Sequence, residues 1–198
     1  MTTLRTTIRP LGIAAAALSL AACASVVAAP AGAFRVGSGY EVSLGRDWSD
    51  ISAVMAGKTR KVRLLSIDGP LLNRLYLTDG LAPGDFLIKP EIKERPTPVI
   101  RKDMSASERL EFITDSVAAL EYQRVELAKP RPGRIGEASG VRFDLTAQTR
   151  EGLDIKGAGV IAERGGKTYV LLYLAPAEHY FDASLAKVEA IMASARLG

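Results

Sequence analysis

Tyr169-Val-Leu-Leu-Tyr-Leu174 is the stretch that decides the fold of this chain. Successive side chains of a strand point to opposite faces of its sheet, and in this stretch apolar side chains occupy both faces. We therefore expect a central strand with other elements packed above and below it. Gly165-Gly166 precedes the stretch, and a Gly-Gly pair readily supplies the positive φ angles of a tight hairpin turn.

Three strand patterns come before this one, in the order of an antiparallel meander. They run from Tyr122 to Leu127, from Val141 to Thr149 and from Leu153 to Glu163. The first reads as an edge strand, and Glu151-Gly152 marks a reversal between the next two. The pair Gly157-Ala-Gly159 lies inside the third pattern, where glycine typically marks a bulge or close packing.

Two amphipathic helices are predicted, one before and one after the meander. Ser105 and Glu108 have the spacing of a capping box, and apolar residues recur at helical intervals from about Ala106 to Leu120. The last helix is expected to follow Asp182, a good N-cap. Its apolar face comprises Phe181, Leu185, Val188, Ile191, Met192 and Ala195. An antiparallel meander packed by two such helices predicts an α+β fold.

The first half of the chain predicts shorter elements. Apolar and polar residues alternate from Tyr40 to Leu44, which indicates a half-buried strand, and Asp47 to Ala56 predicts a short helix or turn around Trp48. Short apolar runs separated by turn residues follow as far as Ile88. The proline-rich basic stretch 89–102 then predicts a long exposed loop, because proline cannot donate a hydrogen bond within a sheet.

The pattern after residue 38 resembles the PsbP-like fold. The features that carry the resemblance are Tyr40 to Trp48, Gly140-Val-Arg-Phe143, Tyr169-Val-Leu-Leu-Tyr173 and Ile191-Met-Ala-Ser-Ala-Arg196. The stretch from Ser66 to Lys102 has no clear counterpart in that pattern. The resemblance implies an α+β sandwich. It also implies an assembly or binding accessory, because members of that fold group commonly act in that way and not as enzymes.

The amino-terminal segment predicts export. Arg5 and Arg9 form a positive region, and the apolar stretch from Leu11 to Leu20 has the length of a secretory signal and is too short to span a bilayer. Leu20-Ala-Ala-Cys23 resembles the lipobox of bacterial lipoproteins. This resemblance implies a signal peptide over residues 1–22 and acyl chains on Cys23, which would hold the protein on a membrane.

The lipobox also sets the expected domain boundaries and location. Residues 23–38 would form a lipidated tether, and residues 39–198 a single domain. With Ala24 in place of aspartate after the cysteine, the resemblance implies the outer membrane, with the domain facing the periplasm. Ordinary signal cleavage after Ala31-Gly-Ala33 is the alternative, and it would leave a soluble periplasmic protein that starts at Phe34.

Composition argues against several classes of function. The chain has 26 Lys and Arg residues against 22 Asp and Glu residues, and two of the cations belong to the leader, so nucleic-acid binding is not expected. Cys23 is the only cysteine, which leaves no internal disulfide. With a single histidine the common kind of zinc site is not expected, although a site made of oxygen ligands stays open. We expect no cofactor.

The basic stretch is the first candidate interaction surface. An exposed cationic loop near a membrane could contact lipid phosphates or an acidic partner. The alternative is a solvated linker whose charge neighbouring acids offset. The candidate residues are Lys89, Lys93, Arg95, Arg101 and Lys102.

Other candidate site residues are few and do not form a catalytic set. Trp48, His179 and Tyr180 are candidate ligand contacts, although a buried tryptophan is more often a core anchor and a lone histidine at a helix entrance more often structural. Ser184-Leu-Ala-Lys187 has the Ser-x-x-Lys spacing of penicillin-recognising enzymes without their other motifs. A solvated first turn of a helix explains both residues.

We therefore expect a cell-envelope lipoprotein that is not an enzyme and whose domain binds an envelope protein or lipid. One alternative is a carrier of a small apolar ligand held between the sheet and a helix, which the many leucines of the first half suggest. A hydrolase acting through His179 and Ser184 is a third hypothesis.

Overall fold

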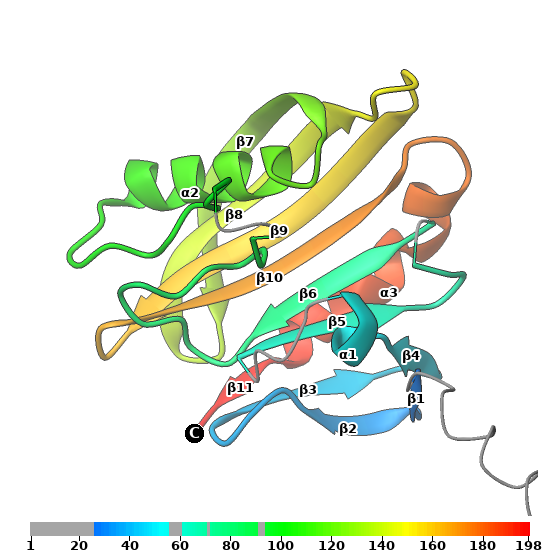
Figure 1. The fold of residues 1–198 in the computed structure, drawn as a ribbon. Coiled ribbons are helices and arrows are strands. Elements are labelled where there is room, and N and C mark those ends of the chain that lie inside the picture. The colour runs from blue at the N-terminus through cyan, green and yellow to red at the C-terminus, as the bar shows by residue number, and fades with distance from the viewer. Residues whose placement is uncertain (1–25, 56–60, 71, 91–93) are drawn as a thin grey trace, which may run out of the picture.

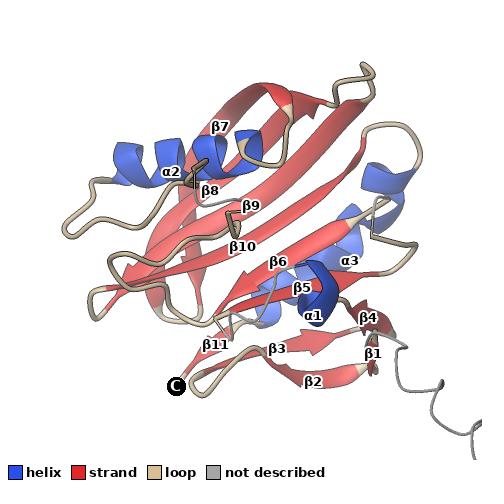
Figure 2. Ribbon diagram, viewed as in Figure 1, coloured by secondary structure: helices blue, strands red, loops and turns tan. Residues whose placement is uncertain are grey.

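The computed structural model describes residues 26–55, 61–70, 72–90 and 94–198. Its main feature is an eight-stranded antiparallel sheet (Figure 1 and Figure 2). The strands lie across this sheet in the order β1 (Val27–Ala29), β4 (Trp48–Asp50), β5 (Val62–Ser66), β6 (Arg74–Thr78), β10 (Lys167–Pro176), β9 (Asp154–Arg164), β8 (Ala138–Gln148) and β7 (Gln123–Ile135).

A smaller sheet and three helices complete the described ranges. The smaller sheet comprises β11 (Arg196–Leu197), β3 (Tyr40–Leu44) and β2 (Gly32–Arg35). The helices are α1 (Ser52–Met55), α2 (Ala106–Ala118) and α3 (Tyr180–Ser194). Helices α2 and α3 lie on opposite sides of the large sheet (Figure 2). The expected α+β class, an antiparallel meander packed by two amphipathic helices, is confirmed.

Strand β10 is central, as its sequence predicts. It pairs with β9 on one side and β6 on the other, and Val170, Leu171, Leu172 and Tyr173 are all fully buried. Leu171 and Tyr173 belong to the core that includes α3, whereas Val170 and Leu172 belong to the core that includes α2. The meander β7-β8-β9-β10 that leads to this strand is also confirmed.

Strand β7 is longer than the predicted segment from Tyr122 to Leu127. It continues to Ile135 through Pro130 and Pro132, with a register shift between Ala128 and Arg131. This is possible because β7 is an edge strand, where a proline without an N–H leaves no ladder bond unmade.

The capping box of α2 is present, and α3 begins earlier than expected. The Ser105 hydroxyl accepts from the Glu108 amide, and the Glu108 carboxylate accepts from the Ser105 amide, which lowers the pKa of Glu108. The N-cap of α3 is His179, with φ at 65°, and the expected cap Asp182 lies in the first turn. The earlier start places Phe181 in the helix, where its ring stacks on Tyr173 at 5.6 Å.

The expected tether is wrong from Val27 onward. Residues 27–29 form β1, which pairs with β4, and residues 32–35 form β2, which pairs with β3. Ala29 is 2% exposed and lies opposite Trp48. These residues therefore add one strand to each sheet, and Ala29 is the one among them that is buried in the core.

Close packing of glycine in β9 gives the first testable prediction. A Cβ atom at Gly159 would lie 2.4 Å from Cζ of the buried Phe143 and 3.0 Å from the Leu171 carbonyl oxygen. We expect Gly159→Ala to lower the free energy of unfolding by about 1–3 kcal/mol through overpacking. Gly45→Ala is the control, because its Cβ would meet nothing within 4 Å. Urea denaturation measures both variants, and equal stabilities would contradict the packing described.

Candidate functional site

Strands β7 and β8 carry charged side chains on the side of the large sheet that faces α3. In β8, Phe143 and Leu145 point to the α2 side and are buried, whereas Arg142 and Asp144 point to the α3 side. Helix α3 packs against β10, β3 and β9. The α3 side of β7 and β8 is therefore left partly open at the edge of this helix.

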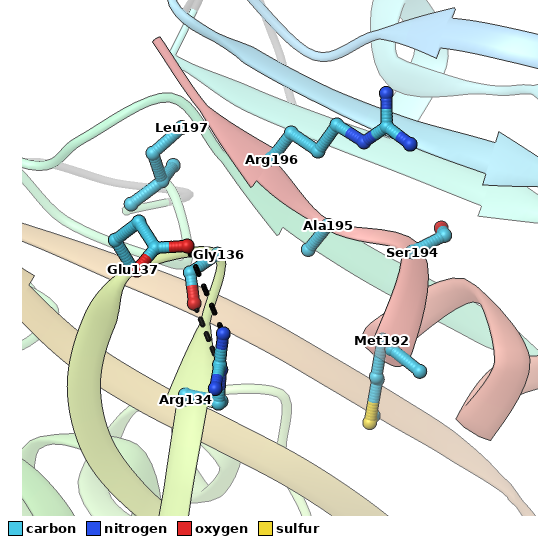
Figure 3. A pocket seen from close by; sticks show the side chains of 9 residues that line it. Arg134, Gly136, Glu137, Met192, Ser194, Ala195, Arg196 and Leu197 are labelled. Carbon is cyan, nitrogen blue, oxygen red and sulfur yellow. Dashed lines mark hydrogen bonds and ion pairs between the residues drawn. The ribbon is translucent and has the colours of Figure 1, made fainter.

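Two grooves follow this edge, and we call them together the β8–α3 seam. The first, of about 390 Å³, lies between β7, β8, β9 and α3, and its charged residues are Lys129, Arg131, Arg142, Asp144, Lys156 and Glu189. The second, of about 690 Å³, lies where the β7–β8 turn meets the last residues of the chain. Figure 3 shows this second groove, with Arg134 reaching Gly136 and Glu137 across the turn and Arg196 pointing away from them.

Arg142 joins the two grooves. One guanidinium nitrogen lies 3.0 Å from the Glu189 carboxylate, and another contacts the sulfur of Met192, which lines the second groove. The Arg142 side chain is only 14% exposed. Burial lowers the pKa of Arg142 and the charge of Glu189 opposes that shift, but an arginine stays cationic at any physiological pH. A fixed positive charge therefore lies at the middle of the seam.

The remaining charges leave the seam positive. Asp144 neutralises two cations in part, because its carboxylate lies 3.0 Å from Arg131 and 3.8 Å from Lys129. Lys156 lies 5.8 Å from the centre of the Phe181 ring, and no carboxylate of the described ranges lies within 4 Å of its ammonium group. The seam as a whole is lined by the cations Lys129, Arg131, Arg134, Arg142, Lys156 and Arg196, and by the anions Glu137, Asp144 and Glu189.

The floor of the first groove is apolar. Phe181 and Leu185 of α3 line it together with Gly157 and Ala158 of β9. Of these two small residues only Ala158 belongs to the core that includes α3, because a Cβ at Gly157 would meet Leu174 and Leu145 on the α2 side. An apolar floor with cations around it can hold a ligand that combines negative charge with apolar groups. Such a groove would bind its ligand through ion pairs and apolar packing.

The structure places the predicted ligand contacts elsewhere. Trp48 is 3% exposed and lies in the core beneath α3. His179 is exposed with its ring edge against Tyr180 at 5.2 Å, and Tyr180 is half-buried against the same core. None of these three residues lines the seam.

Three cations of the predicted basic loop lie close to neighbouring acids. Lys89, Arg95, Arg101 and Lys102 are exposed. Arg95 lies 3.5 Å from Glu121, Arg101 lies 3.0 Å from Glu108, and Lys102 lies 3.9 Å from Asp103. Lys93 of the same stretch, like Cys23 of the lipobox, lies outside the described residues.

Ser184 does not lie on a solvated first turn, which is the structural explanation predicted for it from the sequence. It is 3% exposed and forms a hydrogen bond with Tyr173, whose hydroxyl also donates to the Tyr180 carbonyl oxygen at 3.1 Å. Burial raises the pKa of Tyr173 to about 12, and the bond to Ser184 opposes the rise. Lys187 donates to the Ala183 carbonyl oxygen. Ser184 is buried because it faces the sheet, where it lies beside Tyr173 of β10.

The leucines that suggested a ligand carrier are part of the cores. Leu64, Leu65, Leu75, Leu77 and Leu81 are each at most 1% exposed and pack in one or other of the two clusters. Within the described ranges, no three His, Cys, Asp or Glu side chains gather as metal ligands would. The same ranges hold no helix with the length and apolar character needed to cross a bilayer.

The seam gives a second testable prediction, on stability. Arg142→Ala removes a mostly buried side chain that joins β8 to α3, so we expect it to lower the free energy of unfolding by about 1–2 kcal/mol. The control is Arg131→Ala, whose side chain is 42% exposed and whose loss should cost less than about 0.5 kcal/mol. Thermal and urea unfolding compare the two, and an Arg131 variant at least as unstable as the Arg142 variant would refute this role.

Comparison with known proteins identifies the fold. No protein-family model matches the sequence, and no curated protein matches it either. Among solved structures, the chain is similar to the solution structure of cyanobacterial PsbP (CyanoP) from Synechocystis sp. PCC 6803, with a TM-score of 0.51 and 15% sequence identity. The match covers 96% of this chain and 100% of the cyanobacterial one. The chain therefore has the PsbP-like fold that its sequence pattern predicts.

Proposed function

We propose that this protein is a lipid-anchored accessory module of the bacterial cell envelope, held at the membrane by acyl chains on Cys23, and that its domain binds an envelope component without catalysis. The observation that carries the proposal is the position of residues 27–35 within the fold. It bears directly on which of the two cleavage sites is compatible with a folded product.

Cleavage after Ala33 would remove part of the folded domain. It would take away all of β1 and the first two residues of β2. The buried Ala29 would be lost from its place opposite Trp48, and so would the hydrogen bond from the Ala31 amide to the Asp47 carboxylate at 2.9 Å. Cleavage before Cys23 keeps all of these contacts. The fold thus favours the lipobox over the ordinary site.

The short distance between Cys23 and β1 also fits a membrane anchor. Val27 follows Cys23 by four residue steps along the chain, and an extended chain spans about 3.5 Å per residue, which limits the reach to about 14 Å. Val26, Val27 and Val54 are apolar side chains more than half exposed at this end of the molecule. Such side chains suit the interfacial layer of a bilayer.

Several features support binding over catalysis. The first groove of the seam presents guanidinium, ammonium and carboxylate groups beside apolar side chains, which suits recognition. His179 is exposed, whereas Ser184 is buried and bonded to Tyr173, so the two do not form a nucleophile and base. The resemblance to the PsbP-like fold group, whose members commonly act as accessories, agrees with this proposal.

Processing of the amino terminus is the direct test. Protein purified from membranes of the native host should have a mature mass that starts at Cys23 and includes acyl chains. Cys23→Ser should move the protein from the membrane fraction to the soluble fraction. Ala33→Arg blocks ordinary cleavage at the alternative site and should change neither mass nor location. A native product that begins at Phe34 without acyl chains would overturn the proposal.

A further inference from the structure

The first groove of the β8–α3 seam lies toward the β7 edge of the large sheet, whereas the proposed anchor precedes β1 at the other edge. Strands β1 and β7 are the two edges of the eight-stranded sheet, so seven strand spacings separate them. Neighbouring strands lie about 4.8 Å apart, which makes this separation roughly 30 Å. Figure 1 shows β1 beside the point where the described chain begins and β7 on the opposite side of the molecule.

This separation decides which source of negative charge can reach the seam. Exposed charges at physiological ionic strength are screened over about 8 Å. With Cys23 acylated and β1 beside the bilayer, headgroups of that membrane lie several screening lengths from the seam. An anionic ligand there must come from the periplasmic side, as a segment of another protein does.

The seam has cations available for such a ligand. Lys156 has no carboxylate of the described ranges within 4 Å and lies over Phe181. Arg131 is 42% exposed and shares Asp144 with Lys129. Both cations can therefore accept a new carboxylate without breaking the Arg142–Glu189 pair that holds β8 to α3.

The edge strand determines how a peptide can bind. Pro130 and Pro132 lack the N–H groups that pairing with another strand requires, so β7 is protected against strand addition. The apolar lining of the groove beside it is the half-buried Leu185 together with the largely buried Phe181 and Ala158. A bound peptide segment would therefore contact this groove through its side chains and not through backbone pairing with β7.

We infer that the β8–α3 seam is a docking site for an extended acidic segment of a partner protein, whose carboxylates pair with Lys156 and Arg131 while its apolar side chains pack on Phe181 and Leu185. The inference rests on the proposed anchoring, because the anchor is what keeps the membrane away from the seam. It names the chemistry of the envelope component that the proposed function leaves open.

Titration with defined peptides tests this inference on the full chain in detergent. The probe is a short fluorescein-labelled peptide of alternating aspartate and leucine, and its counterpart of alternating lysine and leucine should not bind. We expect saturable binding of the acidic peptide that weakens with added salt. The double variant Lys156→Glu with Arg131→Glu should raise the dissociation constant at least about tenfold. Lys102→Glu, which reverses one charge on the basic loop, should shift it less than about twofold.

The outcomes separate this inference from its alternatives. Lack of saturable binding to the acidic peptide would overturn it, and so would equal weakening by Lys102→Glu. Binding of phosphatidylglycerol vesicles that depends on Lys156 would assign the seam to lipid instead. Urea unfolding of each variant shows whether a loss of binding reflects a loss of fold. The mass of the mature amino terminus is independent of peptide binding, so failure of the proposed anchoring is recognised separately.

Discussion

The burial of β10 on both faces is the constraint on which the rest of this structure depends. A strand that is apolar on both sides needs a cover on each side of the sheet, and α2 and α3 provide the two covers. One helix is narrower than a sheet of eight strands. Because α3 is placed over β10, β9 and β3, it covers β7 and β8 only in part, and the half-buried Asp144 and the exposed Thr146 of β8 line a groove there. The seam thus results from the position of α3, which packs mainly against β10, β9 and β3.

The same sheet gives the molecule two different edges. At one edge, β1 brings exposed valines and the segment that leads to Cys23 together. At the other, β7 carries prolines and cations, which discourage strand pairing and attract acidic groups. In the proposed role, an anchor at one edge and a charged groove at the other would present that groove to the periplasm. This polarity, and no particular catalytic group, is what the proposed role requires.

Much of the fold could be predicted from local patterns. The capping box at Ser105 and the apolar run of β10 are local signals, and both elements are present. Residues 27–35 could not be recognised as strands, because short stretches of alanine and glycine read as a tether until Trp48 is known to lie opposite Ala29. The early start of α3 depends on the stacking of Phe181 on Tyr173. The seam could not be predicted either, since alternating charges in β8 indicate only a solvated face until α3 is placed beside them.

The orientation of the domain on the membrane is the central claim, and fluorescence quenching measures it most directly. Cys23 is the only cysteine, so an acylated protein has no free native thiol. Single variants Val54→Cys and Thr146→Cys can then be labelled with a fluorophore and studied in vesicles that contain nitroxide lipids. The account predicts strong quenching at position 54, near β1, and little at position 146, in the seam. Equal quenching at the two positions, or stronger quenching at position 146, would contradict it.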